Sequence, residues 1–235
     1  MFCDCDDMFS ESDGLRKLLE CAEQSRADII GSDYSIELKR GNDFVYRTAH
    51  QNTTRVHGKI FKRQYLIERN IRFPDEMEFS GDMYFLYLAY HLTDRIVWLP
   101  DNFYIWKWMP ESVTRGKTHY SVRTYDRMLY CYVLTMRELH RREQSDLRDG
   151  LVIKMFNAAY IDYFSKKFAD APEELSDQAK EAIHSMVREF YGAYLAVPYE
   201  SRRRNYIDQI LMRRTYGPPE KYAGIENWIR GILGN

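Results

Sequence analysis

The chain begins with a dense group of carboxylates, in the stretch MFCDCDDMF. Asp4, Asp6 and Asp7 bring three like charges within four residues, and the nearest basic side chain, Arg16, is too far along the chain to pair with them locally. Such hard oxygen ligands suit Mg²⁺ or Mn²⁺, which take one or two protein carboxylates together with phosphate oxygens. Alternatively, Asp7 or Ser10 caps the helix that follows and the other carboxylates are solvated, because Asp and Ser are common N-caps. The spacing alone leaves the metal site and the helix cap both open.

The elements around this acidic group mix strands and helices. Phe2–Asp6 reads as a short strand that runs into a loop. A helix is expected next, because Leu15, Leu18, Leu19 and Ala22 recur at the spacing of one helical face. Further strands are expected in ADIIGSDYSIEL, GNDFVYR, DRIVWLP and NFYIWKW, with helices over about residues 62–70 and 82–92. Up to about residue 115 this mixture is typical of the α/β or α+β class.

The second half of the chain has a different pattern. After Tyr120 we expect three long amphipathic helices, in YDRMLYCYVLTMRELHRRE, LRDGLVIKMFNAAYIDYFSKKF and ELSDQAKEAIHSMVREFYGAYL, without strand signals between them. Two shorter helices follow toward the C-terminus. The sequence therefore predicts two domains, residues 1–118 and 119–235, of which the second is helical.

The composition excludes several classes of protein. The formal net charge of the 235 residues is −1, so no overall field favours nucleic acid or an anionic membrane. The early carboxylates interrupt the only apolar start, so no signal peptide is expected, and no apolar run reaches the length of a membrane span. The four cysteines form no C-x-x-C pair, so we expect reduced, buried thiols. These features predict a cytoplasmic protein.

Four segments, taken in order, resemble the C-terminal half of a GT-A fold glycosyltransferase of family 2. FCDCDDMF is similar to that family's strand end hDxDDhh, and HGKIFKRQYLIERNIRFPD to its segment WxKLFRRxLLxENxIRFPE. GDMYF stands where the family has EDxxF, and NFYIWKWMPESVTRG resembles its LYYYRxxxxSxTR end. The resemblance covers about residues 1–116 and implies an α/β fold, a partial GT-A-like sheet with helices, followed by an α-helical C-terminal region.

The resemblance implies an inverting, metal-dependent transfer of a sugar from a nucleotide sugar, in the first place a UDP-sugar, to a hydroxyl acceptor. In family terms Asp4 and Asp6 are the metal and nucleotide ligands, and the metal is Mn²⁺ or Mg²⁺. Alternate residues of a strand face the same side, so the two carboxylates can converge on one ion that neutralises the departing diphosphate. Asp7 would then cap the next helix or hold a metal-bound water. The acceptor would be a glycan or modified phage DNA.

The other site residues also follow from the resemblance. Asp82 takes the place of the family's general base, and its expected position at a helix start favours the ionised form that accepts a proton. A plain N-cap role for Asp82 is the alternative. Lys59 and Arg115 are candidate phosphate ligands, although each is more often a solvated charge. The sequence departs from the family pattern in three places: Gly81 replaces a Glu, His57 replaces a Trp, and Trp106–Lys107–Trp108 replaces a tyrosine-and-arginine run.

The family's nucleotide-binding half, which precedes the acidic strand, has no counterpart in this sequence. We therefore expect a second polypeptide that carries this half, or a homo-oligomer that covers the acidic strand. The alternative function is a non-catalytic interaction or nucleic-acid-binding subunit. It depends on five arginines of the helical region that could neutralise phosphates or simply be solvated: Arg202, Arg203, Arg204, Arg213 and Arg214.

Overall fold

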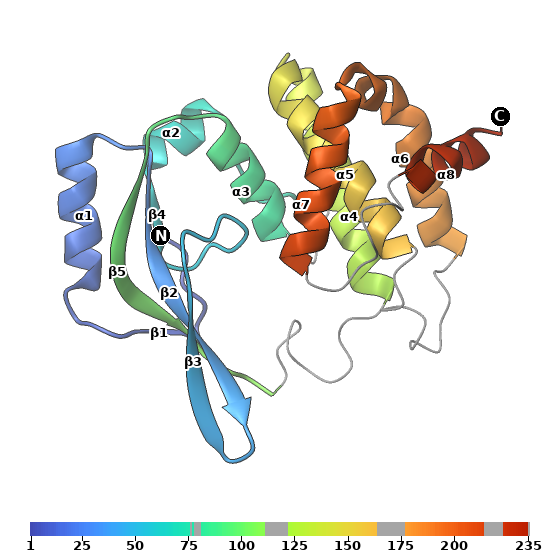
Figure 1. Cartoon of the computed structure of the whole chain (residues 1–235). Helices are drawn as coiled ribbons and strands as arrows, with labels where there is room; N and C mark the ends of the chain where they lie inside the picture. The colour runs from blue at the N-terminus through green and yellow to red at the C-terminus, as the bar shows by residue number, and fades with distance from the viewer. Residues whose placement is uncertain (76, 78–80, 111–121, 164–176, 214–222, 235) are drawn as a thin grey trace. The chain divides into compact units, whose positions relative to one another are not determined.

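The computed structural model describes residues 1–75, 77, 81–110, 122–163, 177–213 and 223–234 (Figure 1). The chain divides into two compact units, Met1–His119 and Tyr120–Asn235. The first unit combines strands with helices, and the described part of the second is helical. The fold class expected from the sequence, α/β followed by a helical region, is confirmed.

The described part of the first unit contains one mixed sheet of five strands with the order β1-β5-β2-β3, and β4 pairs with β2 beside this path. β2 and β5 run parallel, whereas the other pairs are antiparallel. Figure 1 shows α1 on one side of the sheet and α3 on the other. The elements are β1 (Met8–Phe9), α1 (Gly14–Ser25), β2 (Ile29–Arg40), β3 (Asp43–Ala49), β4 (Lys59–Phe61), α2 (Arg63–Glu68), α3 (Gly81–His91) and β5 (Ile96–Trp106).

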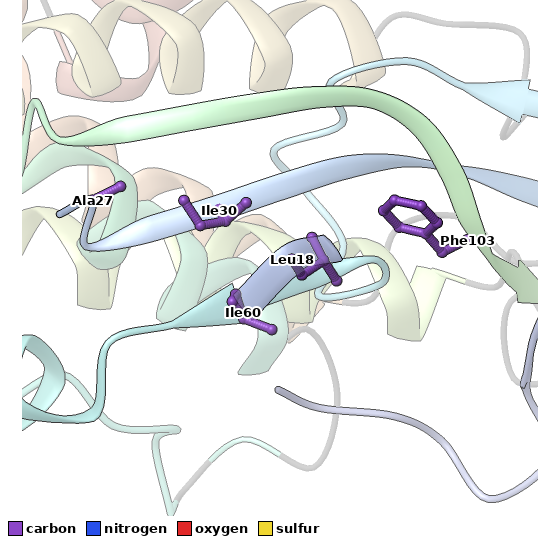
Figure 2. Packing of buried hydrophobic residues seen from close by; sticks show 5 residues of the cluster. All are labelled: Leu18, Ala27, Ile30, Ile60 and Phe103. Carbon is purple, nitrogen blue, oxygen red and sulfur yellow. The ribbon is translucent and has the colours of Figure 1, made fainter. Parts of the chain in front are cut away.

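Apolar side chains from α1 and the sheet form the core of this unit (Figure 2). The apolar spacing of α1 places Leu18 inside at 0% exposure, whereas Leu15 and Leu19 remain exposed at 43% and 50%. The parallel neighbours β2 and β5 contribute further core residues, so the two strands cannot separate without exposing this cluster. Its buried members are Leu18, Ala27, Ile30, Ile60 and Phe103.

The start of the chain differs from the predicted strand Phe2–Asp6. Only Met8–Phe9 forms a strand there, pairing with β5, and a turn precedes it in which the Asp7 N–H donates to the Asp4 carbonyl at 3.1 Å. A strand needs partners for its backbone groups; here the Asp4 carbonyl is paired within the turn, and the Asp4 N–H donates to the Tyr104 hydroxyl at 3.4 Å. The two strands expected in DRIVWLP and NFYIWKW are likewise one strand, β5, with a register irregularity opposite β2.

The second unit is built from α4 (Val122–Arg141), α5 (Ser145–Tyr163), α6 (Asp177–Ala196), α7 (Tyr199–Arg213) and α8 (Ala223–Leu233). The rings of Phe156 and Tyr194 stack inside it with their centroids 4.4 Å apart. Within the described ranges, no helix is both long and apolar enough to cross a bilayer. The expectation of buried thiols is wrong for two cysteines: Cys131 is buried, but Cys3 and Cys5 are exposed.

The basic surface expected on α7 is partly inside the protein. Arg202 is only 6% exposed, and its guanidinium lies 4.7 Å from the ring centroid of Tyr194 and 3.7 Å from a carboxylate oxygen of Glu226. The prediction of a phosphate-binding surface is therefore wrong for Arg202, whereas Arg203 and Arg204 are exposed. The predicted surface also included two residues whose side chains are not described, Arg213 and Arg214.

Candidate functional site

The turn at the start of the chain brings two of the early carboxylates onto one group of residues. One ligand atom each from Asp4, Asp7 and His57 lie within 4.8 Å of one another. The spacing from Asp4 to Asp7 is that of the first and last residues of a β-turn, whose backbone ends approach closely. The turn therefore brings the carboxylates of Asp4 and Asp7 together. The sequence had predicted instead that a strand would bring Asp4 and Asp6 together.

Asp7 is the most firmly held member of this group. Its side chain is 1% exposed; one oxygen accepts from the Tyr104 hydroxyl at 2.6 Å and the other from the Lys107 N–H at 2.9 Å. Burial raises the pKa of Asp7, and these two hydrogen bonds partly offset that increase. Asp7 neither caps α1 nor faces solvent, so its carboxylate is fixed in place before any ligand arrives.

His57 completes the group from the loop between β3 and β4. Its ring stacks on Tyr104 and packs against Trp106, with centroid distances of 5.2 and 5.0 Å, and its Nδ1 lies 3.7 Å from an oxygen of Asp7. Asp4 is exposed, whereas His57 is only 4% exposed. The two carboxylates are the oxygen ligands that suit Mn²⁺ or Mg²⁺, and the imidazole adds a nitrogen donor of the kind that transition metals accept. The group thus has a buried side and a side open to solvent.

A third carboxylate, Asp82, lies in the first turn of α3. One of its oxygens accepts from the Met83 N–H at 2.9 Å, and the other is 3.7 Å from a guanidinium nitrogen of Arg55. Burial and the negative charge of Asp4 raise the pKa of Asp82, and they outweigh the lowering effects of Arg55 and the Met83 N–H. The helix start was expected to favour ionisation, but the net shift favours the proton. A carboxylate with a raised pKa is a stronger base.

Lys59 is fully buried on β4 and faces the main chain. Its Nζ donates to the carbonyls of Arg55 at 2.7 Å and His57 at 2.9 Å, and it lies 5.7 and 5.6 Å from the ring centroids of Tyr34 and Trp98. Burial lowers the pKa of Lys59 to about 7. This geometry gives no support to the predicted contact between Lys59 and a phosphate.

The structure brings only some of the predicted site residues together. The negative charge of Asp4 contributes to the raised pKa of Asp82, so the two predicted carboxylates act on one another electrostatically. Asp6 is exposed and is not a member of the ligand group found among the described residues, so its role as a metal ligand stays a prediction. Arg115 lies outside the described residues. The sequence analysis did not identify Arg55 as a site residue. No motif around Arg55 indicates such a role, because its contact with Asp82 joins two segments that are distant in the sequence.

Among the comparisons with known proteins, the one with solved structures finds matches to this chain. No protein-family model and no curated protein matches the chain. Among solved structures, residues 1–349 of S. aureus TarS in complex with UDP-GlcNAc superpose with a TM-score of 0.55 and 20% identity, covering 89% of this chain and 60% of that one. The same part of TarS in complex with UDP gives a TM-score of 0.53 at 16% identity, covering 100% of this chain and 67% of that one.

At such low identity the likeness concerns the fold alone. The chain spans 60% of the length of the TarS structure with UDP-GlcNAc. Its mixed sheet, the helices on both sides and the helical region that follows agree with the architecture expected from the sequence. Over most of its length the chain therefore shares the fold of residues 1–349 of S. aureus TarS.

Proposed function

We propose that the chain is a metal-dependent glycosyltransferase, or the catalytic part of one, that moves a sugar from a UDP-sugar to a hydroxyl acceptor with inversion. The observation that carries the proposal is the group of Asp4, Asp7 and His57, whose ligand atoms lie within 4.8 Å of one another. The fold similarity to TarS, which was solved with UDP-GlcNAc and with UDP, supports the class of donor.

Asp4, Asp7 and His57 would hold Mn²⁺ or Mg²⁺. Asp7 and His57 form the fixed, buried side of the site, and Asp4 closes it from the exposed side. When bound, the ion would supply positive charge to the diphosphate leaving group. Asp6, next to Asp7 on the exposed turn, is proposed as a further oxygen ligand for the ion or the nucleotide.

Asp82 would act as the general base. Inversion requires an acceptor hydroxyl to attack from the side opposite the leaving group, with a base within hydrogen-bond reach of that hydroxyl. The raised pKa of Asp82 increases its power to take the proton, and Arg55 lies 3.7 Å away to balance its charge. Arg115 is proposed as a phosphate ligand. The acceptor is proposed to be a glycan; the burial of Arg202 removes one argument for DNA.

The proposal is tested by the release of UDP from UDP-GlcNAc, with Mn²⁺ and with the chelator EDTA. We expect release that needs Mn²⁺ and is lost in Asp4→Asn and Asp7→Asn. Asp43→Asn, an exposed carboxylate on the β2–β3 hairpin, is the matched control and should leave release unchanged. Release that persists in EDTA, or in the double variant of Asp4 and Asp7, would contradict a metal-dependent mechanism.

A further inference from the structure

We propose that Lys59 is a positioning residue: its ammonium group holds the loop 50–58 so that Arg55 and His57 face Asp82 and Asp7. The loop connects β3 to β4 and supplies one member of the candidate metal group and the cation beside the candidate base. The effect on metal binding rests on the proposed function, whereas the effect on the loop does not.

The contacts of Lys59 are unusual for a lysine. Its side chain lies in the core at 0% exposure, and its two hydrogen bonds go to main-chain carbonyls, those of Arg55 and His57. Burying an ammonium group is costly unless hydrogen bonds compensate for the lost water. Here the compensation comes from the loop itself, so the loop must keep its shape for the lysine to remain satisfied, and the lysine in turn restrains the loop.

The two ends of the loop are fastened to β2 by other contacts. The N–H and hydroxyl of Ser32 both donate to the Gly58 carbonyl, at 2.9 and 3.0 Å. At the other end the carboxylate of Asp33 accepts from the Gln51 N–H at 3.0 Å and also contacts the ring of His50. Lys59 reaches the stretch between these ends, where the functional side chains originate.

The restrained carbonyls belong to the residues that face the site. Because Lys59 draws the carbonyls of Arg55 and His57 inward, it fixes the backbone from which both side chains extend. The Arg55 guanidinium is 3.7 Å from Asp82, and the His57 ring nitrogen is 3.7 Å from Asp7. A displacement of about 1 Å in such a constellation is enough to cost about a hundredfold in rate.

The test compares Lys59→Met with Lys62→Met. Methionine keeps much of the length of lysine but cannot donate a hydrogen bond, and Lys62 is an exposed lysine three positions along the chain, which makes it the matched control. Hydrogen exchange followed by mass spectrometry measures the loop, and the electron paramagnetic resonance signal of free Mn²⁺ measures metal binding. In Lys59→Met we expect loop amides to exchange about tenfold faster and the Kd for Mn²⁺ to rise about tenfold; in Lys62→Met neither should change.

Thermal unfolding distinguishes a positioning role of Lys59 from a general loss of stability. A variant that is only less stable would bind Mn²⁺ as tightly as wild type at temperatures well below its Tm. If Lys59→Met does not fold, Ser32→Ala removes the hydroxyl hydrogen bond to Gly58 at the β4 end of the same loop and should give faster exchange and weaker Mn²⁺ binding. Unchanged exchange and unchanged affinity in a folded Lys59→Met protein would overturn the proposal. Faster exchange in the loop of a protein whose wild type binds no Mn²⁺ would support the restraint and refute the proposed function.

Discussion

Asp7 shows how burial prepares a carboxylate for a ligand. Both of its oxygens already accept hydrogen bonds, from Tyr104 and the Lys107 N–H, so the side chain has little freedom to lose on binding. Asp6, its neighbour, is exposed and is not held in this way. A preorganised ligand binds more tightly than a free one, because the entropy cost of ordering it is already met by the fold.

The first prediction separates these two residues. Asp7→Asn should raise the Kd for Mn²⁺ at least tenfold, since the amide carries no negative charge and keeps only one of the two acceptor oxygens. Asp6→Asn should change this Kd much less. A Mn²⁺ titration of both variants provides the measurement. A large loss of Mn²⁺ affinity in Asp6→Asn, with none in Asp7→Asn, would show that Asp6 and not Asp7 is the metal ligand.

The second prediction concerns the base. Asp82→Asn keeps the size and capping ability of the side chain but removes its capacity to take a proton, so turnover should fall by about two to four orders of magnitude. Binding of UDP and Mn²⁺ should be retained. Steady-state kinetics together with calorimetry of UDP binding test this outcome. If donor affinity falls as much as turnover, Asp82 is a structural cap of α3.

The third prediction uses the pH dependence of stability. Burial raises the pKa of Glu37, but hydrogen bonds from Lys107, Tyr46 and the Trp108 N–H outweigh it, and the net pKa lies below its ordinary value of 4.5. A lowered pKa stabilises the folded state above pH 4.5, and this contribution is lost as the pH falls through the folded pKa.

Glu37→Gln should therefore be less stable than wild type by about 2 kcal/mol near neutral pH, and the difference should shrink as the solution is acidified. Urea unfolding over a pH series measures it. A difference that stays constant down to about pH 3 would show that the charge of Glu37 has no part in its effect.

At the scale of elements, local patterns predicted more than distant pairings. The helix α1, the β2–β3 hairpin with its turn at Gly41, and α3 from about residue 82 follow from periodicity and turn residues, which act over a few positions. Of the predicted apolar face of α1, however, Leu15 and Leu19 remain exposed. The strand Phe2–Asp6 and the division of β5 were wrong, because strand formation there depends on pairing with segments far along the chain, β1 with β5 and β5 with β2.

The candidate site was also predicted only in part, because it combines residues from segments that are distant in the sequence. Asp4 and Asp82 could be proposed from the resemblance to a known family, and Asp7 only as a helix cap or the holder of a metal-bound water. The roles of Asp7, Arg55 and His57 in the site depend on the turn and the loop that place them there, which the sequence did not predict. His57 was noted in the sequence only as a departure from the family pattern, and the structure supplies a reason for interest in it.

The fourth prediction belongs to α7. Arg202 is buried against the ring of Tyr194, and its other partner, Glu226 at 3.7 Å, is partly exposed. We expect Arg202→Ser to lower the free energy of unfolding by about 2 kcal/mol, because the buried stem of the arginine and its contact with the aromatic ring are lost. Arg203→Ser and Arg204→Ser, at exposed neighbours, should stay within about 0.5 kcal/mol of wild type. Equal effects at all three positions, measured by urea unfolding, would contradict the structural role of Arg202.

At the scale of the whole molecule, two units of different character share one chain. The first carries the sheet, the turn and every member of the candidate site, and the second is an all-helical body within its described residues. The chain spans 60% of the TarS structure solved with UDP-GlcNAc. The expected second polypeptide or homo-oligomer stays a prediction, and light scattering of the purified chain would measure its mass directly.

The most direct test is a Mn²⁺ titration followed by electron paramagnetic resonance, with and without UDP, on wild type, Asp4→Asn and Asp43→Asn. If Asp4, Asp7 and His57 form a metal site for a nucleotide sugar, wild type and Asp43→Asn should bind one Mn²⁺ with an affinity that UDP increases. Asp4→Asn should bind at least tenfold more weakly and lose the effect of UDP. Equal Mn²⁺ binding by all three proteins, or binding that UDP leaves unchanged, would contradict a metal–diphosphate site at the start of this chain.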